Sequence, residues 1–168
     1  MTQEDTSVVA RPLHSRGFSM IELVMILLIS IVVTAFAVPA IGSQLNQYRL
    51  KSAVASATWA IQSIRFQALQ EGYPFQVTFQ GDASGNNPTY QVASKPTGTS
   101  SFANVGSSVP LSGSVINITA ATVIQFQPNG AVTVTQGGSS ATSMQLSFSG
   151  FSRTITISNY GNLTITSP

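Results

Sequence analysis

The sequence predicts an α+β protein in which a long N-terminal helix, membrane-spanning in its first half, packs on an antiparallel β-sheet domain. Three patterns predict this fold: about twenty apolar-dominated residues near the N-terminus, an amphipathic helical pattern directly after them, and alternation of apolar and polar residues through the rest of the chain. The 168 residues suffice for one domain with an additional segment, and the absence of cysteine excludes a disulfide framework.

The composition argues against an enzyme. Charged residues make up 7% of the chain, against about a quarter in typical domains. The single histidine is His14, and beyond residue 17 the acidic residues are Glu22, Glu71 and Asp82. No catalytic triad, carboxylate pair or metal cluster can be assembled from this set, so we expect no cofactor and no metal. A net charge of +2 is also too small for a strongly basic nucleic-acid-binding protein.

Residues 18–38 are long and apolar enough to cross a bilayer as a helix, with Glu22 as their one ionisable group. A cleaved secretory signal peptide is the alternative, because Arg11 and Arg16 precede the run and residues 35–37 form an A-x-A site. The carboxylate inside the apolar run and the length of that run argue against it. The residues therefore favour a retained membrane helix.

The helical pattern continues beyond the apolar run as a one-sided amphipathic stripe. Its apolar positions are spaced alternately four and three residues apart, at Leu50, Val54, Ala57, Ile61, Ile64 and Ala68. Pro39 and Gly42 predict a bend rather than a stop, and Gly72 and Pro74 predict the end of the helix. The sequence thus predicts one helix over 18–70 whose stripe covers a sheet, and we expect Trp59, beside the stripe, to pack against that sheet.

From Phe75 onward the apolar period becomes two, which predicts the strands of one antiparallel sheet. Turn residues separate the predicted strands, which are 75–79, 90–92, 115–118, 123–126, 131–135, 144–148, 154–158 and 163–165. The Ser/Thr/Gly/Pro-rich segment 94–108 predicts a long loop. The segment 82–87 carries oxygen ligands at alternate positions, as a Ca²⁺ loop does, but its single carboxylate, Asp82, suits a turn equally well.

The segment from Arg16 to Leu23, which reads RGFSMIEL, resembles the type IV prepilin cleavage signal G-F-[ST]-L-[IL]-E. The resemblance implies that prepilin peptidase cleaves between Gly17 and Phe18 and that the Phe18 amine is then methylated. It divides the chain into a leader (1–17), an assembly half of the helix (18–41), an amphipathic half (42–72) and a β-sheet domain (73–168). It also implies a pilin-like fold.

The same resemblance gives roles to Glu22 and Pro39. In such proteins the glutamate at the fifth mature position pairs with the α-ammonium of residue one, here Phe18, in its own or a neighbouring chain. Pro39 falls where pilin helices often carry a kink. An unspecific alternative for Glu22 is a carboxylate that snorkels to the headgroups. The resemblance further implies a single-pass protein of the bacterial inner membrane, with a cytoplasmic N-terminus and a periplasmic β domain.

Three C-terminal stretches, 124–130, 144–146 and 153–161, resemble the GspH/FimT group of minor pseudopilins and minor pilins. The group implies other pilin or pseudopilin subunits and membrane lipid as partners. The first expectation is a minor pseudopilin near the tip of a type II secretion pseudopilus, and the alternative is a minor pilin for pilus priming or DNA uptake. Arg153 would be the DNA-binding residue, although Phe151 replaces the first arginine of the G-R-x-R stretch. A membrane-anchored β domain unrelated to pili is a third possibility.

Overall fold

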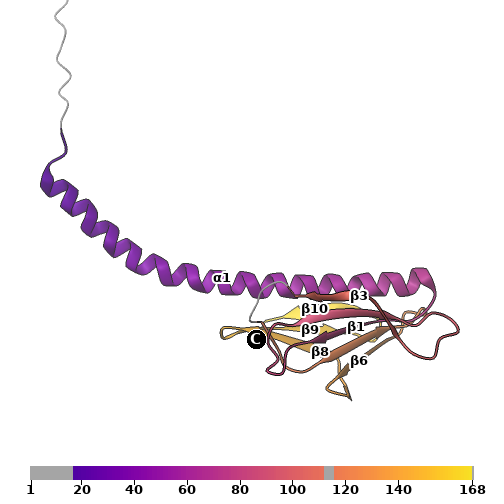
Figure 1. Cartoon of the computed structure of the whole chain (residues 1–168). Helices are drawn as coiled ribbons and strands as arrows, with labels where there is room; N and C mark the ends of the chain where they lie inside the picture. Colours follow the sequence, from indigo (N-terminus) through magenta and orange to yellow (C-terminus); the bar gives the residue numbers. More distant parts are fainter. Residues whose placement is uncertain (1–16, 112–115, 168) are drawn as a thin grey trace, which may run out of the picture. The chain divides into compact units, whose positions relative to one another are not determined.

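The computed structural model describes residues 17–111 and 116–167, apart from the side chains of residues 37–40. The chain divides into two compact units, residues 1–40 and residues 41–168, which are described in turn. Helix α1, Met20–Glu71, contributes its first part to one unit and its second part to the other (Figure 1).

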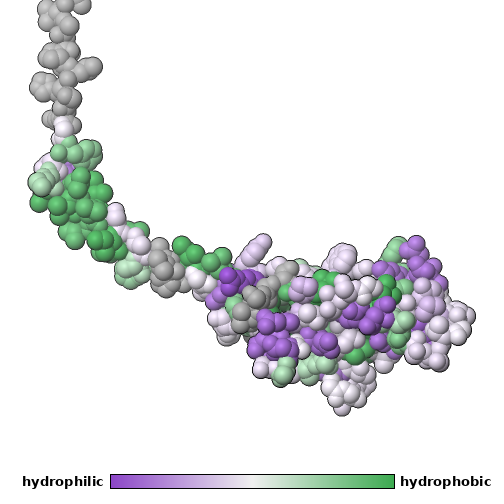
Figure 2. Space-filling model, viewed as in Figure 1, coloured by the Kyte–Doolittle hydropathy of each residue, from purple (hydrophilic) through white to green (hydrophobic). Residues whose placement is uncertain are grey.

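In the first unit, α1 exposes its side chains on every side. The helix begins where the Ser19 carbonyl accepts the amides of Glu22 and Leu23, at 3.0 and 3.2 Å. Every described side chain from residue 17 to residue 36 is exposed, and hydrophobic residues gather over this part of the helix (Figure 2). The Ser30 and Thr34 hydroxyls donate to the carbonyls one turn earlier, at 2.8 and 2.7 Å. The helix therefore satisfies these two hydroxyls from its own backbone, and it is long and apolar enough to cross a membrane.

In the second unit, the inner face of α1 is buried as the stripe predicts. The stripe from Leu50 to Ala68 is buried throughout, and Ala53 and Ala60 widen it. Gly72 ends the helix in the left-handed region, with φ 74°, and its amide donates to the Ala68 carbonyl at 3.2 Å. Just beyond, the Tyr73 hydroxyl donates to Glu71 at 3.3 Å. Partial burial, together with the neighbouring Glu71 carboxylate, raises the pKa of Tyr73.

The prediction that this half of the helix is apolar on one side only was wrong. Large apolar side chains also lie exposed on the face opposite the buried stripe, among them Tyr48, Trp59 and Phe66. Trp59, predicted to pack against the sheet, is 64% exposed and only lines a cavity with Tyr90, Val109 and Pro110 at the sheet edge. The sequence pattern placed the stripe from Leu50 to Ala68 against the sheet correctly, but it missed the apolar residues on the opposite face, which repeat with the same helical period.

The strands form two antiparallel sheets rather than the single sheet predicted from the sequence. One has the order β3-β2-β1-β5-β6-β7 and the other β10-β9-β8-β4. The strands are β1 Phe75–Gln80, β2 Thr89–Ser94, β3 Ala103–Pro110, β4 Asn117–Ile118, β5 Thr122–Phe126, β6 Val132–Gln136, β7 Ser139–Ser140, β8 Ser143–Phe148, β9 Phe151–Ile157 and β10 Leu163–Thr166. Strand periodicity shows which residues face a core, whereas partner choice depends on contacts far apart in sequence.

The prediction of a long loop over 94–108 was wrong, because residues from Ala103 onward form strand β3. It pairs with β2, and all eight of its residues are exposed, so no buried face marks it in the sequence. Its register shifts between the pairs of Tyr90 and Val92, beside Gly106 with φ 73°, and the Gln91 side-chain amide donates to the Gly106 carbonyl at 3.1 Å. Backbone pairing at a sheet edge, with a bulge, defines this strand. Of the strand predicted over 115–118, β4 covers the last two residues, and residue 115 lies outside the described residues.

One hydrophobic core joins the helix to both sheets. Phe79 and Phe126 enter it from the six-stranded sheet, and Met144 and Ile155 from the four-stranded sheet. The helix stripe closes the same cluster, which makes the domain a helix packed on antiparallel sheet, as predicted.

Candidate functional site

The two residues of the predicted cleavage site lie in an open stretch before the helix. Gly17 and Phe18 are both exposed and precede the first helical residue, Met20. A Cβ built on Gly17 would meet no atom within 4 Å. The scissile peptide bond predicted between them is therefore accessible from solvent and is not locked in a helical hydrogen bond, which suits attack by a protease.

Glu22 lies exposed in the first turn of α1. Within the described part of the chain its carboxylate makes no hydrogen bond or ion pair, while its backbone amide donates to the Ser19 carbonyl. A carboxylate in the first turn of a helix lies near the positive end of the helix dipole. Cleavage after Gly17 would create an ammonium at Phe18, four residues before Glu22 in the sequence. In the uncleaved chain that nitrogen is an uncharged amide.

The kink predicted at Pro39 falls on residues 37–40, whose side chains lie outside the described residues. The same holds for the leader residues before Gly17, including Arg11, His14 and Arg16.

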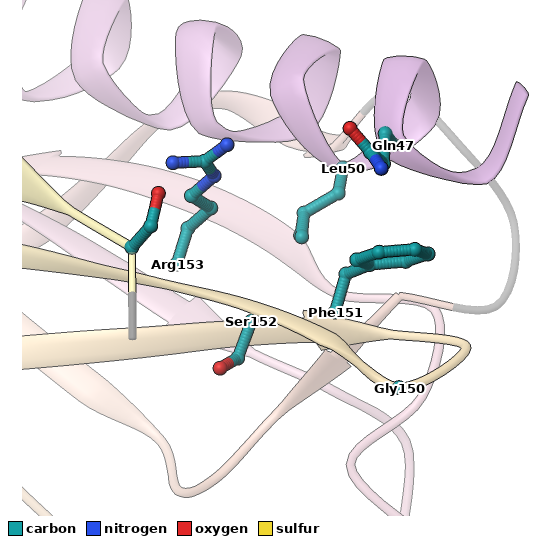
Figure 3. Close-up of a pocket in the computed structure, with 7 residues that line it drawn as sticks. Gln47, Leu50, Gly150, Phe151, Ser152 and Arg153 are labelled. Atoms are coloured by element: carbon teal, nitrogen blue, oxygen red, sulfur yellow. The ribbon is translucent and has the colours of Figure 1, made fainter. Parts of the chain in front are cut away.

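Arg153 lies half-buried on β9 and faces the helix. Together with Phe151 it projects toward Gln47 and Leu50 of α1 (Figure 3). These four residues, with Gly150, Ser152 and Ser167, line a cavity of about 280 Å³. The strand is held in place by its hairpin with β8, whose Ser149-Gly150 turn has positive φ at both residues, as a type I′ turn requires. The Asn46 side-chain amide donates to the Ser149 hydroxyl at 3.1 Å and ties this turn to the helix.

The fold brings a second cation to Arg153. Lys51 of α1 and Arg153 line one shallow pocket with Val54, Ala55 and Ile165. Neither cation makes an ion pair within the described residues. The sequence separates them by about a hundred positions, so no local motif could have indicated the pair. Arg65, in contrast, is used structurally, because its guanidinium donates to the Gly161 carbonyl at 3.2 Å.

The loop at Asp82 is organised as a turn. One carboxylate oxygen accepts the amides of Ser84 and Asn86, at 2.9 and 3.0 Å, and the other accepts the Asn87 side chain at 3.4 Å. The residues that resembled a Ca²⁺ loop thus donate three hydrogen bonds to the carboxylate from within the loop, as in a turn.

Comparison with known proteins does not assign the chain to a family. No family model, no curated protein and no solved structure matches it.

Proposed function

We propose that the chain is a minor pseudopilin, a structural subunit of a type II secretion pseudopilus that assists protein export. The single observation that carries the proposal is the G-F-S-M-I-E signal from Gly17 to Glu22 at the start of a membrane-length helix. In this proposal the helix anchors the protein in the bacterial inner membrane, with the N-terminus cytoplasmic and the domain periplasmic. The fold of the second unit is then pilin-like.

The exposure of residues 17–36 supports an assembly role. No described residue covers this apolar helical surface, and a surface of this length is typical of a site that contacts lipid, other protein subunits, or both. An ionisable residue at such a position is costly and usually has a partner. In the proposal the partner of Glu22 is the Phe18 ammonium that cleavage creates, in its own or a neighbouring subunit, and prepilin peptidase is the processing enzyme.

A minor pilin of a type IV pilus is the second candidate, for priming or DNA uptake. The observation that favours it is the convergence of Lys51 and Arg153 on one pocket. Two cations are far fewer than the phosphate contacts of a tight DNA binder, which keeps this candidate second.

Processing of the full chain tests the proposal. Co-expression with a prepilin peptidase should remove 17 of the 168 residues and leave 151, beginning with N-methylated Phe18. Intact mass and N-terminal sequencing measure this. The matched control is Gly17→Val, which should stay uncleaved, because a β-branched side chain hinders close approach to the backbone. A mature chain that begins at Val38 would instead show cleavage at the A-x-A site and would overturn the proposal.

A further inference from the structure

The β10 edge of the four-stranded sheet is open for backbone pairing. β10 is the last strand in the order of this sheet and pairs with β9 on one side. The Ser158 amide donates to the Asn162 carbonyl at 3.0 Å, and hydrogen-bonded positions alternate along an antiparallel ladder. The amides and carbonyls of Leu163 and Ile165 therefore point away from β9, where an extended chain can bind them.

The other three edges of the described sheets are less suited to an added strand. β3 has a register shift beside Gly106, and its last residue, Pro110, offers no amide. β4 and β7 have two residues each. Bulges, prolines and very short strands are features that protect sheet edges from pairing. β10 keeps a regular register over its four residues without a proline, so it is the most open of the four edges.

The hydrophobic core is incomplete at the β10 edge. Ile165 lies opposite Ile155 in the ladder, so the two side chains share one face of the sheet. Ile155 is fully buried in the core that α1 closes, whereas Ile165 is 49% exposed. A further strand beyond β10 would place a side chain beside Ile165 on this same face and would cover it.

Two cations lie at this edge without a carboxylate. Lys51 is exposed on α1, Arg153 projects from β9 toward the helix (Figure 3), and both line the pocket of about 280 Å³ that contains Ile165. The two carboxylates of the second unit have donors elsewhere. Glu71 accepts a tyrosine hydroxyl, and Asp82 accepts three hydrogen bonds from its own loop. An anion in the pocket would therefore meet two charges that no described carboxylate neutralises.

We propose that the β10 edge binds an extended peptide segment whose glutamate or aspartate side chain enters this pocket, between Lys51 and Arg153. The backbone of the segment pairs with Leu163 and Ile165. Side chains at every second position of the segment face α1, so the matching sequence has an acidic residue with apolar residues two positions away. A nucleic acid would offer phosphates to the cations but no amides to the strand, which favours a polypeptide.

The proposal does not depend on the proposed function, because neither the cleavage signal nor the apolar run takes part in it. Peptide binding to the full chain in non-ionic detergent tests it. The probe is a labelled, capped peptide of sequence TVTETVT, and the control peptide has glutamine in place of the glutamate. Fluorescence anisotropy measures both affinities at several salt concentrations. We expect the glutamate peptide to bind at least ten-fold more tightly, and the difference to decrease as salt is added.

Substitutions in the pocket test the role of the cations. Arg153→Gln should weaken binding of the glutamate peptide at least ten-fold, and Arg153→Lys should retain most of the affinity because it keeps the charge. Lys51→Gln, at an exposed position, should weaken binding about five-fold without disturbing the fold. The matched control is Arg49→Gln, which removes an exposed cation of α1 outside the pocket and should leave binding unchanged. Circular dichroism verifies the fold of each variant.

Methylation of the peptide amides tests strand addition. A strand added to a sheet pairs through one of its edges, so methyl groups on the amides of one peptide edge should abolish binding, and methyl groups on the other edge should not. Equal effects of the two methylated peptides would overturn the pairing with β10. Equal affinities of the glutamate and glutamine peptides would overturn the carboxylate site.

Short duplex DNA is the competing anion. Displacement of the glutamate peptide by an equal concentration of duplex would assign Lys51 and Arg153 to phosphate and would overturn the proposal. Cleavage at Gly17 is scored on the same preparations. A chain that binds the peptide but is not cleaved by prepilin peptidase would contradict the proposed function and leave the peptide site intact.

Discussion

The two regions of helix α1 differ in how much of their side-chain surface the rest of the protein covers. From residue 20 to residue 36 every side chain of α1 is exposed, whereas from Leu50 to Ala68 an entire face is buried against two sheets. The backbone has the same helical hydrogen bonds in both regions, so the difference lies in what covers the side chains. The side chains of the first region are not covered by any described residue, whereas the second region has one face covered by the domain.

In the second region the domain covers only one face of the helix. Its inner face belongs to the core, while Trp59 and Phe66 on its outer face remain exposed like the side chains of the first region. The helix is thus open to other partners along its whole described length, and only the β-sheet domain limits this, on one side.

The largest expected effect is that of Glu22→Leu in the first region. Leucine suits a bilayer better than glutamate, so membrane insertion should be retained. Loss of the partner for the Phe18 ammonium should reduce incorporation into filaments at least ten-fold. Crosslinking to other filament subunits measures incorporation, and alkaline extraction of membranes measures insertion. Unchanged crosslinking would mean that Glu22 only snorkels to the headgroups.

In the second region, the inner and outer faces should respond differently to truncation. A fragment that starts at Asn46 retains every buried helix side chain, and we expect it to fold as a soluble monomer. In this fragment Ile61→Ala should lower the free energy of unfolding by about 2–5 kcal/mol, because it leaves a cavity in the core. Leu69→Ala, on the exposed outer face, should change it by less than about 0.5 kcal/mol. Urea unfolding followed by circular dichroism measures both, and equal effects would contradict the division into two faces.

Substitution of two glycines by alanine should change stability by smaller amounts and in opposite directions. Gly161 has φ 77°, and a Cβ there would lie 2.9 Å from Phe126 and 3.2 Å from Arg65. Gly161→Ala should therefore destabilise the domain by about 1–3 kcal/mol. Gly42 lies in the helix with open space around it, so Gly42→Ala should stabilise the helix by up to about 1 kcal/mol. Melting temperatures of fragments that start at Ile41 compare the two, and a stabilising Gly161→Ala would refute the close packing at Arg65.

The smallest expected effect concerns DNA. Lys51 and Arg153 share a pocket, but two cations neutralise too few phosphates for tight binding at physiological salt. We expect no shift of short duplex DNA at low-micromolar protein, measured by electrophoresis. A clear shift that Arg153→Ala removes would favour the DNA-uptake function over secretion.

The local pattern of apolar, polar and turn residues in the sequence predicted most of the secondary structure and the buried face of the helix. The apolar run, the stripe from Leu50 to Ala68, the end of the helix at Gly72 and most strands follow from side-chain periodicity and turn chemistry, which act over a few residues. The signal at Gly17 and Glu22 is likewise contiguous, so sequence alone brings its members together.

Only the tertiary structure decided which strands pair, and with that which surfaces remain free. The division into two sheets and the meeting of Lys51 with Arg153 depend on residues far apart in the chain. The edge strand β3 pairs with its neighbour β2, but its exposed residues give it no apolar pattern in the sequence. The stripe from Leu50 to Ala68 was predicted to be covered, but only the structure shows that the apolar residues of the opposite face stay exposed. The sheets cover one face because the chain folds back to it after Gly72, and the opposite face is what that folding leaves exposed.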